Sequence, residues 1–554
     1  MPSSIPKDGK AYSSQPEDES DDAGEGLAES RRGAAVDEQF ADESYKLFSK
    51  VNATELSPDE AKKLRNKCLW RVIPFLCLGY HLMYVDKQTL GSSAILGIME
   101  DNNLSSNEYN WLSSIFYFGY LLAEWPQNWA LQRFPVAKWL SLNLVIWGGI
   151  ILLHIPCKSF GSLFAVRFLL GLAEACIVPA FLLIMSMFFT YHEQAVIMPV
   201  MWSIGNSSPI TSGLLSYGVL WIDTPGFAPW RWFMVITGVV TVIFGACVYL
   251  YFPDSPVHAR FLTLEERAQV IVRIKENQSG IEQKRFKKYQ FIEAISDPKT
   301  WLFFLHAWSQ EMANGVTNQY SLIINSFGFT VLQTTLLGMV TGLVGFVSLS
   351  LAAIALYNTK NCRAWISLVA YIPGALSSIL LLALPWSNRW GLVTGIWIRS
   401  AVGVPYAVVM IWAANASAGH TKKTTVIALY HIGYGLGNII SPQLFQPQWK
   451  PRYRPTWIIL LVVRTLLTPT EVTDSSAKHH YQVAAILPAM TIVTLWVYLN
   501  KENKRRDQLE RDNQVNDTGV VETVDADGTR TAHVVDNTQL DLTDRENLKF
   551  RYVL

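Results

Sequence analysis

Charged side chains are scarce in this chain of 554 residues, where Asp, Glu, Lys and Arg make up 16% of the composition. A soluble domain usually carries about 25%, so much of the surface is expected to face lipid. The formal net charge is only +1, which argues against the strongly basic face of a nucleic-acid-binding protein. We therefore expect no nucleic-acid partner.

Cysteine is scarce too, and the six that occur are scattered through mostly apolar runs without a CxxC pair. Neither a disulfide framework nor a zinc site is predicted. HExxH, GxSxG and Walker patterns are missing, so a membrane-embedded enzyme is the least favoured class. We expect no metal, no cofactor and no catalytic residues.

A signal peptide is not predicted either, because residues 1–60 are polar and acidic and contain no apolar segment. Residues 1–69 and 501–554 are predicted to be disordered cytoplasmic tails. Targeting to the membrane then depends on the first apolar run.

Long apolar runs are what the chain has in abundance. Residues 70–252 and 301–500 each contain six, separated by a charged loop at 253–300, and each run is close to the roughly 20 residues needed to cross a bilayer. The sequence therefore predicts an all-α, multi-pass membrane protein of 12 transmembrane helices in two six-helix halves. The predicted spans are 71–95, 109–131, 136–155, 161–189, 195–221, 231–252, 301–327, 331–357, 364–386, 390–415, 424–445 and one within 456–499.

Lysine and arginine in the short flanks predict the orientation. Basic residues gather before the first span, in the 253–300 loop and after the last span, which places both termini in the cytoplasm. A basic cluster at Lys450, Arg452 and Arg454 falls on the outer side and departs from this rule.

Ionisable residues inside a span cost about 2.5–3.5 kcal/mol each, so those that persist usually face a cavity or a partner. In the first span Asp86 and Lys87 are adjacent and cannot share a helix face. Either Asp86 points inward and couples to protons while Lys87 goes elsewhere, or both lie at the interface.

The second and fourth spans each carry a polar stripe. Glu124 and Asn128 share one face just before Arg133, an arrangement typical of a structural clamp or gate. Arg167 and Glu174 lie on one stripe of the fourth span. They form a gating or structural charge pair, or Arg167 binds an anionic ligand.

The seventh span is unusually polar around Gly315. Glu311, Asn314 and Asn318 share a face, which predicts a cavity wall with a broken or bent segment at the glycine. Here Glu311 is a candidate for proton binding and the two asparagines are candidates for substrate binding.

Two later spans add to the predicted cavity. Arg399 lies in the tenth span and is a candidate partner for an anion. In the eleventh, His431, Tyr434 and Asn438 share one face. His431 is either a proton carrier or a hydrogen-bonded packing residue, and the other two are candidates for substrate contact.

These residues also resemble a known family. The sequences 84-YVDK-87, 124-EWPQN-128 and 167-RFLLGLAEA-175 look like signatures of the anion:cation symporter branch of the major facilitator superfamily. The segments 437-GNIISP-442 and 451-PRYRP-455 resemble fungal allantoate permease-like transporters, with Ser441 where a glycine is common. The resemblance covers residues 70–462 and resumes after residue 482.

The resemblance implies a monomeric secondary active transporter in the plasma membrane. Its function would be proton-coupled uptake of a small organic anion, such as allantoate, ureidosuccinate, nicotinate or pantothenate, by alternating access. Efflux of a secondary metabolite and nutrient sensing by a transporter-like protein are the alternatives.

The last span contains an anomaly. Residues 456–469 are apolar but too few to cross the bilayer comfortably, and a polar stretch from Glu471 to His480 separates them from the apolar segment 481–499. Val463-Arg464 and Gln482 can be encoded by splice-donor and splice-acceptor triplets, so 463–482 reads as an unspliced insertion. Without it one continuous span results; a genuine insertion with two short helices is the rival interpretation.

Overall fold

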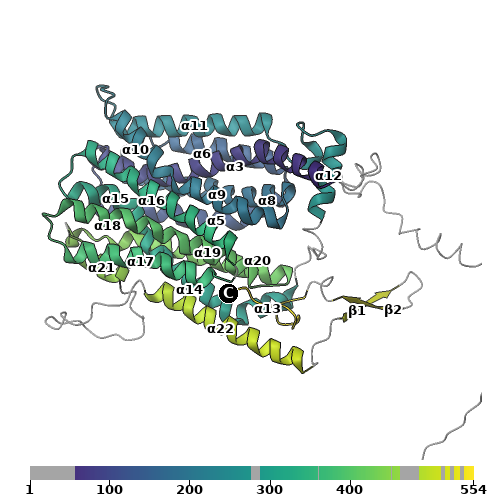
Figure 1. The fold of residues 1–554 in the computed structure, drawn as a ribbon. Helices are drawn as coiled ribbons and strands as arrows, with labels where there is room; N and C mark the ends of the chain where they lie inside the picture. The colour runs from purple at the N-terminus through teal and green to yellow at the C-terminus, as the bar shows by residue number, and fades with distance from the viewer. Residues whose placement is uncertain are drawn as a thin grey trace, which may run out of the picture. The chain divides into compact units, whose positions relative to one another are not determined.

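The computed structural model describes residues 57–275, 287–359, 361–450, 452–461, 486–512, 518–524, 530–536 and 542–554. Within these residues the chain forms a bundle of helices (Figure 1). The described strands, β1 (Thr518–Val524) and β2 (Arg530–Asp536), form an antiparallel hairpin in which Val521 pairs with His533. The predicted helical membrane fold is confirmed.

The first half contains a series of helices joined by short turns. Its helices are α3 (Pro58–Ile95), α4 (Ile98–Asp101), α5 (Ser106–Arg133), α6 (Val136–Leu152), α7 (Phe160–Glu174), α8 (Ile177–Phe188), α9 (Tyr191–Asn206), α10 (Ser208–Val219) and α11 (Pro229–Tyr251). Helix α11 packs along α6, and α5 packs along α7. These two helix pairs make the most extensive helix–helix contacts of this half.

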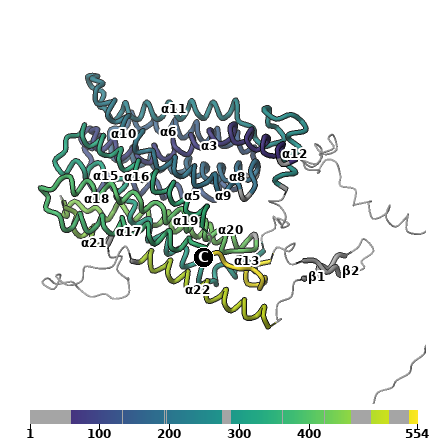
Figure 2. The backbone as a smooth tube through the Cα atoms, viewed as in Figure 1, coloured from purple at the N-terminus to yellow at the C-terminus, as the bar shows by residue number. Residues whose placement is uncertain are grey.

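The second half repeats this organisation. Its helices are α14 (Pro298–Glu311), α15 (Gly315–Ser326), α16 (Val331–Asn358), α17 (Arg363–Ala383), α18 (Arg389–Arg399), α19 (Gly403–Asn415), α20 (His420–Ile440), α21 (Arg454–Leu461) and α22 (Ile486–Arg511). Between the halves, α12 (Leu264–Lys275) packs on α8 and α13 (Lys288–Ser296) packs on α20. We call the end of the bundle that carries α12 and α13 the linker end, and the opposite end the far end (Figure 2).

Local sequence explains where several helices begin. Ser105 and Glu108 form a capping box at the start of α5, with the serine hydroxyl accepting from the Glu108 N–H and the Glu108 carboxylate accepting from the Ser105 N–H. Thr190 and Glu193 do the same for α9. These caps satisfy backbone donors that a helix leaves unpaired at its first turn.

Six of the described helical segments are long and apolar enough to cross a membrane: 59–95, 160–188, 229–251, 331–358, 363–383 and 389–415. Helix α6 is apolar but shorter. The helix α5, which is rich in polar side chains, is not among the six. The predicted number of 12 spans and the domain boundaries based on it therefore stay predictions.

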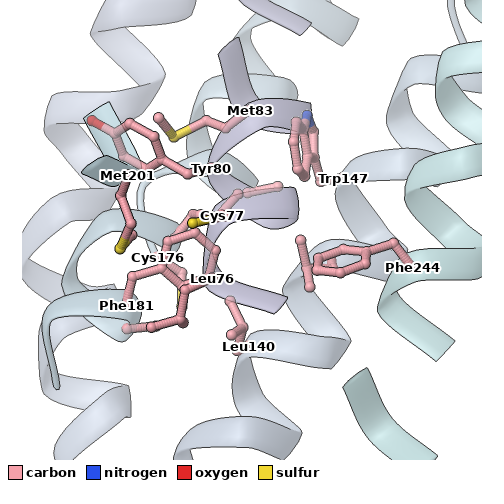
Figure 3. Packing of buried hydrophobic residues seen from close by; sticks show 14 of the residues in the cluster. Leu76, Cys77, Tyr80, Met83, Leu140, Trp147, Cys176, Phe181, Met201 and Phe244 are labelled. Carbon is pink, nitrogen blue, oxygen red and sulfur yellow. The ribbon is translucent and has the colours of Figure 1, made fainter. Parts of the chain in front are cut away.

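The core of the first half forms around α3. Leu76, Cys77 and Met83 of α3 pack against Trp147 of α6 and Phe244 of α11 (Figure 3). Trp147 is fully buried. All six cysteines are free, and four of them are buried and act as small apolar side chains.

Among the described helices, four spans are interrupted where polar residues occur. Helix α7 ends at Glu174, α9 ends at Asn206, α14 ends at Glu311 and α18 ends at Arg399, and each continues in a new helix within a few residues. Short 3₁₀ segments, η3 (Met312–Asn314) and η4 (Ser400–Val402), bridge the last two breaks. The break beside Gly315 was predicted from the sequence; those beside Glu174, Asn206 and Arg399 were not.

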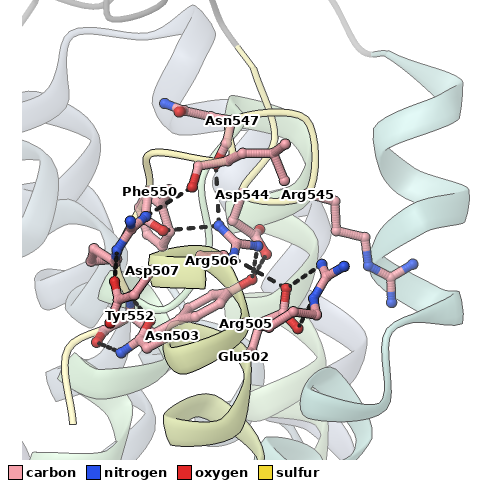
Figure 4. A network of polar contacts seen from close by, with 12 residues as sticks. Glu502, Asn503, Arg505, Arg506, Asp507, Asp544, Arg545, Asn547, Phe550 and Tyr552 are labelled. Atoms are coloured by element: carbon pink, nitrogen blue, oxygen red, sulfur yellow. Dashed lines mark hydrogen bonds and ion pairs between the residues drawn. The ribbon is translucent and has the colours of Figure 1, made fainter. Parts of the chain in front are cut away.

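The carboxy-terminal part differs from the predicted disordered tail. Helix α22 continues to Arg511, and residues 542–554 pack against it and against the linker end of the second half. The Arg506 guanidinium, 1% exposed, donates to the carbonyl oxygens of Asn547 and Phe550 (Figure 4). The prediction was wrong here because polarity alone cannot show that the tail's charged groups find buried partners.

Residues 463–482 lie outside the described residues. On either side of them, α21 ends at Leu461 and α22 begins at Ile486. Both helices pack against α17. Trp457 of α21 joins the aromatic cluster of Phe445 and Tyr453, whereas Trp496 of α22 packs on Trp365 at the start of α17.

Candidate functional site

A cavity of about 210 Å³ lies between the two halves. From the first half it is lined by Tyr84, Lys87 and Asn206, and from the second by Glu311, Arg399 and Tyr434, among others. Three of these, Asn206, Glu311 and Arg399, are the last residues of interrupted helices. Interrupted helices expose backbone groups and polar side chains to a cavity, which continuous apolar helices do not.

Lys87 is the cation that the first half presents to this cavity. Its ammonium lies 3.5 Å from Oε1 of Glu174 and 3.3 Å from the Tyr434 hydroxyl. The same ammonium is 5.3 Å from the ring centre of Tyr84, which is within cation–π range. All of these contacts are long, so the ammonium retains the capacity to donate to a further acceptor.

Two arrangements were expected for this pair, with Asp86 inward and Lys87 elsewhere or with both at the interface, and neither holds in full. Asp86 is 3% exposed, but Lys87 also points inward and lines the cavity. The sequence spacing is consistent with this position, because Tyr84 and Lys87 are three residues apart and share a helix face. Asp86 was predicted as the site residue of this pair, and this spacing was not used.

Asp86 and Arg167 lie next to the main cavity, in a hollow of about 20 Å³ that Lys87, Glu174 and Asn318 also line. The Asp86 carboxylate accepts a 2.8 Å hydrogen bond from the Trp147 indole N–H and a 3.3 Å bond from the Thr89 hydroxyl. Arg167 donates to the same hydroxyl at 3.3 Å. Both predicted residues are thus brought together, but neither lines the main cavity.

Gly171, between Arg167 and Glu174, permits the expected close approach of helices. A Cβ atom there would lie 2.0 Å from the carbonyl oxygen of Phe116 in α5. No side chain larger than hydrogen fits without moving α5 or α7. This contact holds the fourth span, and with it Glu174, against the second span.

The polar face of the seventh span forms the hydrogen-bonded wall that was predicted. The Asn438 amide donates to Oε2 of Glu311 at 2.9 Å, and the Asn314 amide donates to Oδ1 of Asn438 at 2.6 Å. Ser441 stabilises the break by donating to the Met312 carbonyl at 2.6 Å and accepting from the Gly315 N–H. The hydroxyl thus satisfies backbone groups that the interruption frees.

Two further predicted residues lie around this wall. Asn318 lines the cavity, and its carbonyl accepts a 3.1 Å bond from the Tyr109 hydroxyl of the first half. Arg399 also lines the cavity, donates to the Ala313 carbonyl at 3.2 Å and lies 5.9 Å from the Trp457 ring. Arg399 therefore connects the breaks of the seventh and tenth spans.

Gln310 belongs to the polar seventh span but was not among the residues predicted for the site. It lines the cavity, donates to the Val402 carbonyl at 2.6 Å and accepts from the Tyr371 hydroxyl. These bonds tie the break at η3 to the break at η4.

His431 and Tyr434 share a face of α20 as expected, but only Tyr434 of the two lines the main cavity. Tyr434 lines the main cavity, and both residues line an adjoining hollow of about 70 Å³. His431 Nδ1 lies 3.0 Å from the Ile427 carbonyl of its own helix. Several methionines, including Met83 and Met201, give the adjoining hollow an apolar lining.

The predicted clamp of the second span is looser than expected. The Asn128 amide donates to the Glu124 carbonyl of its own helix at 2.8 Å. Arg133 is exposed and lies 5.4 Å from the Trp129 ring. Within the described part of the chain Glu124 forms no ion pair, although it is within electrostatic range of His431.

Hydrogen bonds between the two halves close the cavity at the far end. The Asn110 amide of α5 donates to the Phe445 carbonyl at 2.9 Å and accepts from the Gln319 amide at 2.8 Å. The Ser114 hydroxyl, one turn further along α5, donates to the Ile439 carbonyl at 2.7 Å and accepts from Gln443 at 2.9 Å. A polar seam of this kind holds the halves together on one side of the cavity.

Residues 76–442 match the family model of the Major Facilitator Superfamily. The chain belongs to the major facilitator superfamily. In the same fold, the crystal structure of a D-xylose–proton symporter superposes with a TM-score of 0.55 at 12% identity, covering 77% of this chain and 97% of that one. The predicted fold of two helical halves is confirmed by this match.

Curated relatives in this superfamily are fungal transporters. An uncharacterized transporter of Schizosaccharomyces pombe is 36% identical over 94% of this chain and 89% of its own length. The high affinity cysteine transporter of Saccharomyces cerevisiae is 34% identical over 78% and 83%, and the allantoate permease of that yeast is 30% identical over 93% and 90%. The chain is therefore a membrane transporter of small molecules and not an enzyme, as predicted.

Proposed function

We propose that this protein imports a small carboxylate-bearing solute by proton-coupled alternating access. The observation that carries the proposal is the Lys87 ammonium, which lines the cavity between the halves and has only contacts of 3.3 Å or longer to Tyr434 and Glu174. A carboxylate entering the cavity can form the short, charge-assisted bonds that this ammonium lacks. Cysteine and allantoate, named for two of the relatives, both carry a carboxylate.

Glu174 supplies a route for coupling to protons. Its carboxylate is fully buried, and neither of its oxygens has a hydrogen-bond partner within the described residues. The Lys87 ammonium at 3.5 Å is the cation that balances its charge. Protonation of Glu174 frees Lys87 for the substrate, and loss of the substrate restores the pair, so proton and solute move together.

The predicted proton carriers Asp86, Glu311 and His431 hold less favourable positions for this role. Asp86 is stabilised by Trp147 and Thr89, and Glu311 by Asn438. Glu174, placed among the gating residues by the sequence, is the buried carboxylate in direct contact with the cavity cation. We therefore assign the coupling step to Glu174 and Lys87.

The linker end is cytoplasmic in this proposal, and the protein acts as a monomer in the plasma membrane. The polar seam at the far end, formed around Asn110 and Ser114, then closes the cavity to the outside. On this proposal the cavity releases its substrate toward the linker end, on the side of the adjoining hollow that His431 and Met201 line.

Uptake of labelled cysteine, allantoate, nicotinate and pantothenate by yeast cells expressing the protein tests this function. We expect accumulation of at least one acid, and its abolition by a protonophore. Lys87→Ala should lower uptake about 100-fold, equal to roughly 3 kcal/mol of binding, while Lys87→Arg retains part of it. Lys138→Ala, at a lysine 60% exposed, is the control that should behave like the wild type.

Other outcomes would point to the alternative functions. Movement of a solute only from the cytoplasm outward, measured in inside-out vesicles, would establish efflux. A transcriptional response to an external acid without any flux would establish a sensor. Full uptake by the Lys87→Ala protein would contradict the site assignment.

A further inference from the structure

The cavity contains a carboxylate as well as a cation. Glu311 lines it from the second half, as Lys87 does from the first. The two side chains are close enough for the Lys87 ammonium to act electrostatically on the Glu311 carboxylate. They form no ion pair with each other, whereas Lys87 is paired with Glu174.

Helix α20 sets the spacing between these two charges. Tyr434 accepts from Lys87 through its hydroxyl, and Asn438, one turn later, donates to Oε2 of Glu311 at 2.9 Å. Consecutive turns of a helix are about 5.4 Å apart. A cation and an anion are therefore presented along one helix face, with a small separation between them.

The remaining hydrogen bonds orient Glu311 toward the cavity. Asn314 donates to Asn438 at 2.6 Å, and the Asn438 amide in turn donates to only one oxygen of Glu311. The carboxylate thus keeps acceptor positions for a further donor. A buried carboxylate held in this way at a helix break favours a cationic ligand over a second anion.

We propose that the substrate is a small zwitterion, an α-amino acid, whose carboxylate binds Lys87 and whose ammonium group binds Glu311. This inference rests on the proposed function, since it assumes transport through the same cavity. It adds that a solute with a carboxylate alone leaves Glu311 without a partner. A volume of about 210 Å³, below the usual 300–1,000 Å³ of drug-binding pockets, suits a solute of this size.

Counterflow in liposomes containing the purified protein tests the inference, because exchange needs no net proton movement. The probes are matched pairs that differ in the amino group: L-cysteine with 3-mercaptopropionate, L-alanine with propionate, and L-aspartate with succinate. We expect the wild type to exchange an amino-bearing member at least tenfold faster than its partner. Glu311→Gln, which keeps the acceptor for Asn438, should remove that preference, and Glu311→Asp should restore part of it.

Each outcome separates this inference from others. If Glu311 is only a proton carrier, Glu311→Gln keeps exchange and preference unchanged while losing proton-driven accumulation, and the inference is overturned. Equal or faster exchange of the acids without an amino group also overturns it, as does exchange of allantoate, nicotinate or pantothenate without exchange of any probe. Either result leaves the transport of carboxylates standing. If the wild type exchanges none of the probes and none of allantoate, nicotinate and pantothenate, the proposed function fails and the inference falls with it.

Discussion

At the scale of single residues, buried charges in this protein occur in compensated groups. In the cavity Lys87 is balanced by Glu174. At the linker end Asp544 contacts Lys299 and Lys422, whose side chains are 1% and 0% exposed. Removing one member of such a group is costly because it leaves the others buried and uncompensated.

The surroundings of Asp544 lead to a prediction about how the stability of the fold depends on pH. Burial raises the pKa of this carboxyl, but the Lys299 and Lys422 ammoniums and the Tyr552 hydroxyl outweigh burial and lower its pKa to about 2. A lowered pKa in the folded state means that the stabilisation is fully present above the ordinary carboxyl range, near pH 4. It is then lost progressively as the pH falls toward 2.

We therefore expect Asp544→Asn to destabilise the protein by about 3 kcal/mol at pH 7. The difference from the wild type should shrink as the pH falls from about 5 toward 2, because the wild-type carboxyl takes up a proton in the unfolded state before it does so in the folded state. Thermal unfolding of the detergent-purified protein at several pH values measures both effects. Asp59→Asn, which alters an exposed carboxylate, is the control; equal behaviour of the two variants would contradict the prediction.

Residue-scale prediction from the sequence was strongest where spacing alone mattered. The shared face of Glu311, Asn314 and Asn318, and the close approach at Gly171, follow from helical periodicity and were found. The position of Lys87 was missed, because the choice between two adjacent charged residues depends on which partner, here Glu174, another helix presents. The sequence also did not predict that Arg167 lies beside the main cavity instead of lining it, because its position too depends on partners from other helices.

At the scale of helices, the interruptions are the features that sequence patterns revealed least. The break at η3 lies between polar residues and Gly315, and this local composition predicted an interruption there. The break after Glu174 lies in an apolar run, and only the packing of α7 against α5 and α8 against α6 makes it visible. The carboxy-terminal helix α22 was mistaken for disorder beyond residue 501 because its polar face binds residues 542–554.

The last span leads to a prediction about residues 463–482. Helices α21 and α22 both pack against α17, with Trp457 near the far-end aromatic cluster and Trp496 near the start of α17. Deleting 463–482 leaves four residues between Leu461 and Ile486, which is about one helical turn. One continuous span across the membrane would result.

We expect the deleted protein to be more abundant at the cell surface and to melt at a higher temperature than the full chain. Sequencing of the mature transcript gives an independent measurement, and cDNA that retains these codons would contradict an intron. A matched control deletes residues 276–286 of the 253–300 loop. Loss of surface expression on removal of 463–482, but not of 276–286, would show that the insertion belongs to the folded protein.

At the scale of the whole molecule, transport requires the two halves to separate at the end where they now meet. The seam consists of hydrogen bonds from α5 to α15, α20 and the segment after it, with Ser114 and Gln443 2.9 Å apart at their side-chain polar atoms. A few neutral hydrogen bonds of this kind contribute about 1 kcal/mol each. A seam of that strength holds the halves closed but lets them part when a substrate binds.

Cross-linking of the seam is therefore expected to stop transport. In a Ser114→Cys, Gln443→Cys protein, a short bifunctional methanethiosulfonate should abolish uptake, and a reductant should restore it, because the far end cannot open while the link is intact. Each single-cysteine variant treated in the same way should transport normally, since the protein's own cysteines are partly or fully buried. Uptake that persists with the link demonstrated by mass spectrometry would mean that the halves move without opening here. The alternating-access mechanism proposed for this protein would then have to be abandoned.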